Sequence, residues 1–222
     1  MPPHTGTLAG IIFDMDGVLC DSEPFIAEAA QRMFQETYGL SVTRGDFAPF
    51  VGAGEDRFIG GVAEKYGVAL TMPRDKQRTY AIYLDIIQGR LHPLPGAVDF
   101  IHQCRGRGLK LALATSADRI KMEGNLREIG IPKDTFDAIV AGEDVTKKKP
   151  DPHIFLLAAQ RIGLPPAACL VIEDAVNGVK AGKAAGCRCL GITSTFPADA
   201  LRAVGADDTA PDLAHVPASV LT

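Results

Sequence analysis

The sequence predicts an α/β protein in which a parallel sheet carries helices on both faces and holds a helical insert. Five short apolar runs recur along the chain, and helical patterns separate the last four of them. Most of these runs are continuously apolar, which is typical of strands that are covered on both faces. A stretch without any strand pattern follows the first run. The chain of 222 residues is long enough for one core domain with a smaller insert.

The predicted strands cover residues 8–13, 109–116, 136–140, 169–174 and 187–193. The helical patterns that separate the later strands each end at a glycine, the usual C-terminal stop of a helix. Alternating strands and helices require right-handed crossovers, and so they predict a Rossmann-like three-layer core with a parallel sheet. Residues 196–221 have the pattern of a last helix and an edge strand.

Residues 24–90 interrupt this alternation with helical patterns alone. A first helix is predicted to start at Pro24, because proline favours the first position of a helix. Two further helices are predicted over 56–67 and 73–89. The proline-rich stretch 91–96 leads back to the sheet. We therefore expect a core domain made of residues 1–22 and 92–222, and a helical domain made of residues 23–91.

Composition excludes several classes of protein. A formal net charge of -4 argues against general binding of nucleic acid or of an anionic membrane. No apolar stretch approaches the about 20 residues that span a bilayer, and the first residues lack the pattern of a signal peptide. The five cysteines are scattered, which favours free thiols in a reducing compartment over a disulfide or zinc framework. We expect a cytoplasmic monomer.

Two pairs of acids stand at the predicted strand ends. Asp14 and Asp16 follow the first strand, and Glu173 and Asp174 end the fourth. Parallel strands bring ligand sites to their carboxyl ends, so these acids are expected to meet and to repel one another. A divalent cation removes that repulsion, and an all-oxygen donor set suits Mg²⁺. Solvated loop acids or helix caps explain one such pair as well as a metal does, but two pairs favour the metal.

The second strand and the loop after the third add groups that bind phosphate. Thr115 and Ser116 precede a helix, where hydroxyls and free amides form a phosphate seat, although an ordinary helix cap explains them too. Lys149 lies directly before Pro150, while Lys147 and Lys148 read as solvated charges.

Together these segments resemble the four motifs of the haloacid dehalogenase superfamily. "FDMDG", "LATS", "KKKPDP" (with Lys149 as its lysine) and "VIEDA" occur in the family's order and span nearly the whole chain. Members of this superfamily are mostly Mg²⁺-dependent phosphatases and phosphomutases. The insert is similar to the helical cap of the β-phosphoglucomutase-like, or CbbY-like, subfamily. The resemblance thus implies a phosphoric monoester hydrolase that acts on a small phosphorylated substrate.

The resemblance also implies a role for each motif residue. Asp14 would be the nucleophile that forms an aspartyl-phosphate. The Asp16 side chain would protonate the leaving alcohol and then deprotonate the attacking water. Thr115 and Lys149 would bind the transferring phosphoryl group.

The expected Mg²⁺ ligands are the Asp14 side chain, the Asp16 backbone carbonyl and the Asp174 side chain. Glu173 would join them directly or through water.

The chain departs from the phosphomutases of this subfamily at two places. Ile26 stands where they carry a histidine, and Glu55 stands where they carry a cap arginine that grips a second phosphate. Hydrolysis of a small phosphomonoester such as a sugar phosphate is therefore favoured over phosphomutase activity. The expected substrate-facing residues are Glu23, Gly52, Ala53, Gly54, Glu55, Ser116, Ala117 and Arg119.

Other functions of such a fold compete with this interpretation. A metal-free dehalogenase would leave Glu173 and Asp174 without a task. A phosphotransfer receiver domain is shorter and lacks the 24–90 insert. A catalytically silent regulatory module on the same fold stays open, because a sequence does not report turnover.

Overall fold

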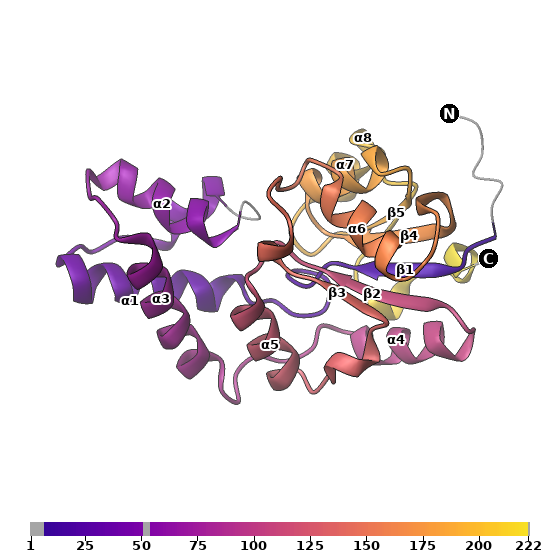
Figure 1. Ribbon diagram of the computed structural model, residues 1–222, viewed down its shortest axis with the longest axis horizontal. Coiled ribbons are helices and arrows are strands. Elements are labelled where there is room, and N and C mark those ends of the chain that lie inside the picture. The colour runs from indigo at the N-terminus through magenta and orange to yellow at the C-terminus, as the bar shows by residue number, and fades with distance from the viewer. Residues whose placement is uncertain (1–6, 51–53, 222) are drawn as a thin grey trace.

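The structure is a computed structural model that describes residues 7–50 and 54–221. It has two parts, a sheet flanked by helices and a group of helices that projects from one end of the sheet (Figure 1). The first part is built from the start of the chain and its second half, and the group of helices is built from the segment between them.

The sheet confirms the predicted fold class. Its six strands are all parallel and lie in the order β3-β2-β1-β4-β5-β6. Strand β1, the first in the chain, lies in the middle of the sheet with β2 on one side and β4 on the other. The strands are β1 (Gly10–Phe13), β2 (Lys110–Ala114), β3 (Ala138–Val140), β4 (Cys169–Glu173), β5 (Arg188–Ile192) and β6 (Asp208–Ala210). The last of these is the edge strand expected within residues 196–221.

Helices cover both faces of the sheet, which accounts for the continuously apolar strands. α4 and α5 lie on one face, and α6, α7 and α8 on the other (Figure 1). Within β1, Ile11 and Phe13 belong to the core cluster on the α4 face, while Ile12 belongs to the cluster on the opposite face. The helices are α4 (Ala97–Gly106), α5 (Arg119–Glu128), α6 (His153–Arg161), α7 (Val176–Ala184) and α8 (Ala198–Ala203).

The insert is helical, as predicted. It contains α1 (Glu23–Tyr38), a 3-10 helix over Arg44–Phe50, α2 (Glu55–Tyr66) and α3 (Met72–Ile87). We call this group the cap helices. α1 packs along α3, and α3 in turn packs against α5 of the sheet part. The core cluster on the α4 face runs without a break into the cap helices, through residues such as Met33, Phe34 and Tyr83. That residues 23–91 form a domain separate from residues 1–22 and 92–222 stays a prediction.

Two further observations concern the cysteines and the lengths of the helices. All five cysteines are buried free thiols. Across the part of the chain that the structure describes, every helix is too short or too polar to cross a membrane.

Candidate active site

The predicted strand ends bring the motif residues together. Asp14 follows β1 directly, and its backbone N–H donates to the Ile172 carbonyl of β4 (2.9 Å). Thr115 follows β2 in the same way and donates to the Val140 carbonyl of β3 (3.0 Å). Glu173 is the last residue of β4. The strand ladders thus fix the backbone at each of these positions.

Three carboxylates converge at this edge of the sheet. Asp14, Glu173 and Asp174 are all buried, and one carboxylate oxygen of each lies within 4.8 Å of the others. Such an all-oxygen set is what Mg²⁺ prefers. The Asp16 side chain lies outside this group, which is compatible with the predicted backbone ligand at that position.

Lys149 supplies the cation that faces the three acids. Its Nζ lies 2.7 Å from Asp14 Oδ1 and 2.5 Å from Glu173 Oε1, and its side chain is only 6% exposed. The second oxygen of Glu173 accepts hydrogen bonds from the backbone N–H groups of Asp174 and Ala175, both at 2.9 Å. Glu173 is therefore held at both oxygens.

One ammonium does not balance these carboxylates. Burial raises the pKa of Asp14 to about 7, since the lowering effect of Lys149 is smaller and both Glu173 and Asp16 raise it further. Burial raises the pKa of Asp174 well above its usual value, with Glu173 and Asp14 adding to the effect. Burial opposes the charge on Lys149, but the two neighbouring carboxylates outweigh it and raise its pKa. The site therefore has negative charge to spare, and the residues present fit a bound Mg²⁺.

Two glycines leave room for the carboxylates. A Cβ on Gly178, in the first turns of α7, would lie 1.8 Å from Glu173 Oε1. Gly17 has φ +76°, and a Cβ there would lie 2.0 Å from Asp174 Oδ2. Any side chain at either position would displace a carboxylate of the cluster.

The Asp16 carboxylate is held apart from this cluster by two donors. The Ser22 hydroxyl donates to Asp16 Oδ1, and Lys121 Nζ lies 3.0 Å from Asp16 Oδ2. Lys121 also lies 3.3 Å from Glu55 Oε1 and 5.9 Å from the centre of the Tyr83 ring. The general acid predicted from the sequence is thus tied to the cap helices through a buried lysine.

A cavity of about 360 Å³ opens onto these groups. From the sheet part it is lined by Asp14, Asp16, Thr115, Lys149, Glu173 and Asp174, the residues expected to carry the chemistry. From the cap helices and the loop before α2 it is lined by Glu23, Ile26, Phe50, Gly54, Glu55 and Phe58. The cavity thus lies between the carboxyl ends of the strands and the cap helices.

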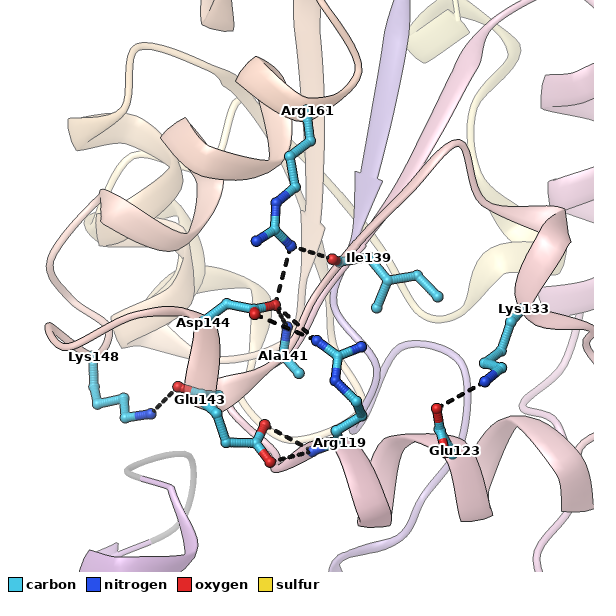
Figure 2. Close-up of polar contacts among 10 residues, drawn as sticks. Arg119, Glu123, Lys133, Ile139, Ala141, Glu143, Asp144, Lys148 and Arg161 are labelled. Atoms are coloured by element: carbon cyan, nitrogen blue, oxygen red, sulfur yellow. Dashed lines mark hydrogen bonds and ion pairs between the residues drawn. The ribbon is translucent and has the colours of Figure 1, made fainter.

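Five of the expected substrate-facing residues line this cavity: Glu23, Gly54, Glu55, Ser116 and Ala117. Gly52 and Ala53 lie outside the described residues. Arg119 does not line the cavity. Its guanidinium pairs with Asp144 (3.1 Å), and its backbone N–H donates to Glu143 (2.9 Å; Figure 2).

Other residues of the cavity were not anticipated from the sequence. Lys121 stands out because it is buried and contacts both Asp16 and Glu55. The signal that could have found it is a charged residue on the buried side of α5, one turn before the buried Asn125. The cavity is also lined by Phe50, Phe58, Asn177, Thr195 and Phe196.

The two lysines before Lys149 point elsewhere. Lys148 Nζ donates to the Gly142 carbonyl (2.5 Å; Figure 2), and Lys147 is exposed and pairs with Asp151 (3.7 Å). Of these three lysines, Lys149 is the one that contacts the buried carboxylates of Asp14 and Glu173.

Comparison with known families decides the assignment. The model of the haloacid dehalogenase-like hydrolases matches residues 8–186, which include every motif residue described above. The chain belongs to this family. The resemblance inferred from the sequence is therefore confirmed.

Individual relatives match most of the chain. Protein SUPPRESSOR OF QUENCHING 1, chloroplastic, of Arabidopsis thaliana is 41% identical over 214 residues, which are 95% of this chain but only 20% of that protein. The phosphorylated carbohydrates phosphatase of Thermotoga maritima is 33% identical and is matched over 81% of this chain and 82% of its own length. A crystal structure of a CbbY variant from Rhodobacter sphaeroides, in complex with xylulose-1,5-bisphosphate, has a TM-score of 0.82 at 26% identity and covers 94% of this chain and 96% of that one.

Proposed function

We propose that this protein is a Mg²⁺-dependent phosphohydrolase that cleaves a small phosphomonoester, a sugar phosphate, through an aspartyl-phosphate intermediate. The observation that carries the proposal is the buried set of Asp14, Glu173 and Asp174 with Lys149 across it, all lining one cavity. The enzyme class, a phosphoric monoester hydrolase, is confirmed by the family and by relatives that are named phosphatases. The sugar phosphate rests on two of those names, which specify phosphorylated carbohydrates and fructose 1-phosphate.

The metal would be held by the side chains of Asp14 and Asp174 and the backbone carbonyl of Asp16, with Glu173 direct or through water. When bound, Mg²⁺ neutralises charge on the phosphoryl group and on the acids around it. A need for such neutralisation agrees with the raised pKa values of Asp14 and Asp174 in the protein without metal.

The residues of the chain supply the bond-making steps. The Asp14 carboxylate attacks phosphorus, and the bond from phosphorus to the ester oxygen breaks. Lys149 and the Thr115 hydroxyl donate to the phosphoryl oxygens. The Thr115 oxygen already accepts from the Ala117 N–H (3.1 Å), so its own proton is free to donate.

Asp16 carries the protons in this mechanism. Its carboxyl group protonates the ester oxygen as the alcohol leaves, and its carboxylate then takes a proton from the water that attacks the aspartyl-phosphate. Inorganic phosphate leaves, and Asp14 is regenerated. Ser22 and Lys121 act as positioning residues, because they hold the Asp16 side chain on the cavity side of the site.

The phosphomutase alternative requires a grip for a second phosphate. Among the described residues that line the cavity, the only cations are Lys121 and Lys149, and both are engaged by carboxylates. Ile26 and Glu55, which stand at the mutase positions, both line the cavity and carry no positive charge. Hydrolysis is therefore the function that we propose.

Phosphate release from a panel of sugar phosphates, with Mg²⁺ and with EDTA, tests this proposal. We expect metal-dependent release from the wild type and none from Asp14→Asn. Conversion of β-glucose 1-phosphate to glucose 6-phosphate without release would establish the mutase. Absence of turnover in a folded protein that binds Mg²⁺ would favour the silent regulatory module.

Two expectations about the protein's surroundings stay predictions. The monomeric state is one of them. A cytoplasmic location is the other, and a relative that matches 95% of this chain is named chloroplastic.

A further inference from the structure

Glu55 presents an unused carboxylate oxygen to the cavity. It is the first residue of α2, it is 8% exposed, and it lines the cavity. Its Oε1 lies 3.3 Å from Lys121 Nζ, but its Oε2 has no hydrogen-bond partner among the described residues. A buried acceptor without a donor is costly, so a ligand that supplies a donor would gain from meeting it.

The charges around the cavity argue against a ligand with a second anionic group. Of the described lining residues, seven are acids and two are lysines. Lys149 is engaged by Asp14 and Glu173, and Lys121 by Asp16 and Glu55. Beyond the phosphoryl group at the metal, a second phosphate or a carboxylate would meet Glu55 with no free cation beside it.

The rest of the cap side is suited to an uncharged group. Phe50, Phe58 and Ile26 give the cavity an apolar wall. Ser116 lines it as well, and its hydroxyl is buried without a hydrogen-bond partner. Besides this apolar wall, the lining offers two buried polar atoms without a hydrogen-bond partner in the described structure, Glu55 Oε2 and the Ser116 hydroxyl.

We propose that Glu55 selects the leaving group, by accepting a hydrogen bond at Oε2 from a hydroxyl of an uncharged, hydroxylated phosphomonoester. This inference rests on the proposed function and names the substrate class of the same site. Glu55 thereby favours polyol and sugar monophosphates over esters that carry a second anionic group. A donor-free alkyl phosphate would leave the oxygen unpaired and is disfavoured for that reason.

An ammonium could also supply a donor, but the structure favours a hydroxyl. Lys121 already lies against the other oxygen of Glu55, at 3.3 Å. A second ammonium at Oε2 would face this like charge across one carboxylate, whereas a hydroxyl would not.

A neighbouring tyrosine offers an internal alternative. The Tyr80 hydroxyl, on α3, is buried and makes no well-aligned hydrogen bond in the described structure. Burial first, then the charges of Glu55 and Asp118, and then looser side-chain hydrogen bonds to the same two carboxylates raise the pKa of Tyr80. The experiment must therefore separate a substrate hydroxyl from Tyr80 as the natural donor.

Four three-carbon phosphate esters provide a matched panel: glycerol 3-phosphate, propyl phosphate, 3-phosphoglycerate and 3-aminopropyl phosphate. A second panel uses six-carbon esters: fructose 6-phosphate, fructose 1,6-bisphosphate and hexyl phosphate. The general substrate p-nitrophenyl phosphate reports phosphatase activity independently of this preference. We expect kcat/KM for the hydroxylated monophosphate to exceed that of its donor-free and anionic counterparts by about tenfold or more, in whichever panel is turned over.

Variants assign this preference to Glu55. We expect Glu55→Gln to reduce discrimination against 3-phosphoglycerate or the bisphosphate by about tenfold, because the repelling charge is gone. Glu55→Ala should also lose the preference for glycerol 3-phosphate over propyl phosphate. Glu64→Gln, on the same helix but exposed, changes the same charge and should leave every ratio unchanged. Tyr80→Phe should do likewise.

Several outcomes would overturn the inference while leaving the proposed function intact. These are equal rates on hydroxylated and anionic esters, a Glu55→Gln enzyme with wild-type ratios, and a Tyr80→Phe enzyme that behaves like Glu55→Ala. Faster turnover of 3-aminopropyl phosphate than of glycerol 3-phosphate would show that the site reads a cation. Turnover of p-nitrophenyl phosphate alone would exclude the proposed substrate class. Failure on every ester, p-nitrophenyl phosphate included, would sink the proposed function itself and the inference with it.

Discussion

Lys149 Nζ lies 2.7 Å from Asp14 Oδ1, so the predicted nucleophile and the predicted phosphoryl-binding cation share one buried contact. The two residues are 135 positions apart in the chain and meet because the loop after β3 returns to the end of β1. The same ammonium reaches Glu173 of β4. This arrangement ties the charge of the nucleophile to that of the metal-binding acids.

Replacing Lys149 should therefore impair the chemistry. We expect Lys149→Met to lower kcat/KM by about 10²–10³, the usual effect of removing a buried donor from a developing negative charge. Lys147→Met is the matched control, because Lys147 is exposed and pairs only weakly with Asp151. A Lys149→Met enzyme with near-wild-type kcat/KM, measured at saturating Mg²⁺, would remove Lys149 from the mechanism.

In the absence of divalent cations, stability should fall as pH rises. The pKa of Asp14 is raised from 3.8 to about 7 in the folded protein, and that of Asp174 is raised as well. The folded state thus binds protons more tightly than the unfolded state, so the free energy of unfolding decreases between about pH 4 and 7. Lys149 stays protonated in both states over this range.

Thermal unfolding in EDTA between pH 5 and 8 checks this dependence. Asp14→Asn removes one of the carboxyl groups with a raised pKa and should flatten the curve, whereas Asp199→Asn, at a fully exposed side chain, should not. Wild-type protein that gains stability over this pH range would contradict the charge imbalance described above.

Mg²⁺ should stabilise the folded protein by relieving the same repulsion. At a concentration 100 times its Kd, a ligand that binds only the folded state adds about 2.7 kcal/mol to the free energy of unfolding. We expect a clear rise in Tm for the wild type and a smaller one for Asp14→Asn, measured by thermal denaturation with and without Mg²⁺. Equal shifts in the two proteins would place the ion elsewhere.

Gly178 should be intolerant of even the smallest side chain. Its Cβ would lie 1.8 Å from Glu173 Oε1, so Gly178→Ala must displace a carboxylate of the cluster. We expect weaker Mg²⁺ binding, by isothermal titration calorimetry, together with lower activity. Gly60→Ala makes the same change in a helix with open space around it, and should be neutral or stabilising by up to about 1 kcal/mol. Unchanged Mg²⁺ affinity in Gly178→Ala would contradict the predicted role of Glu173.

Lys121 should matter for both stability and rate, because it is buried between Asp16 and Glu55. Lys121→Met leaves two carboxylates without their cation, which typically costs about 3–5 kcal/mol when such a pair is buried. We expect kcat to fall while KM for a small ester changes little, because the lysine positions Asp16. Lys133→Met, at an exposed lysine, is the control. A changed KM with an unchanged kcat would argue against a positioning role for Lys121.

Much of the site could be predicted because parallel strands collect their ends at one edge. Asp14, Thr115 and Glu173 each stand at the end of an apolar run, and the alternation of strands and helices fixed the edge on which they meet. The role of Lys149 came from its motif. Spacing alone does not separate it from Lys147 and Lys148.

The contacts between the cap and the sheet part could not be predicted in the same way. Lys121 reaches Asp16 only because of the rotation of α5, and it reaches Glu55 only because the first residue of α2 lies at the cavity. Arg119, expected to face the substrate, pairs instead with Asp144 outside the cavity (Figure 2). Such pairings depend on tertiary packing between distant segments, which local periodicity does not encode.

The most direct test of the central claim is to trap the intermediate. Wild-type enzyme turning over a sugar phosphate with Mg²⁺ is treated with hydroxylamine, which converts an acyl phosphate to a hydroxamate, and its peptides are analysed by mass spectrometry. The account predicts a hydroxamate at Asp14 that requires both substrate and Mg²⁺. Turnover with Asp14 unmodified, or modification at another carboxylate, would contradict it.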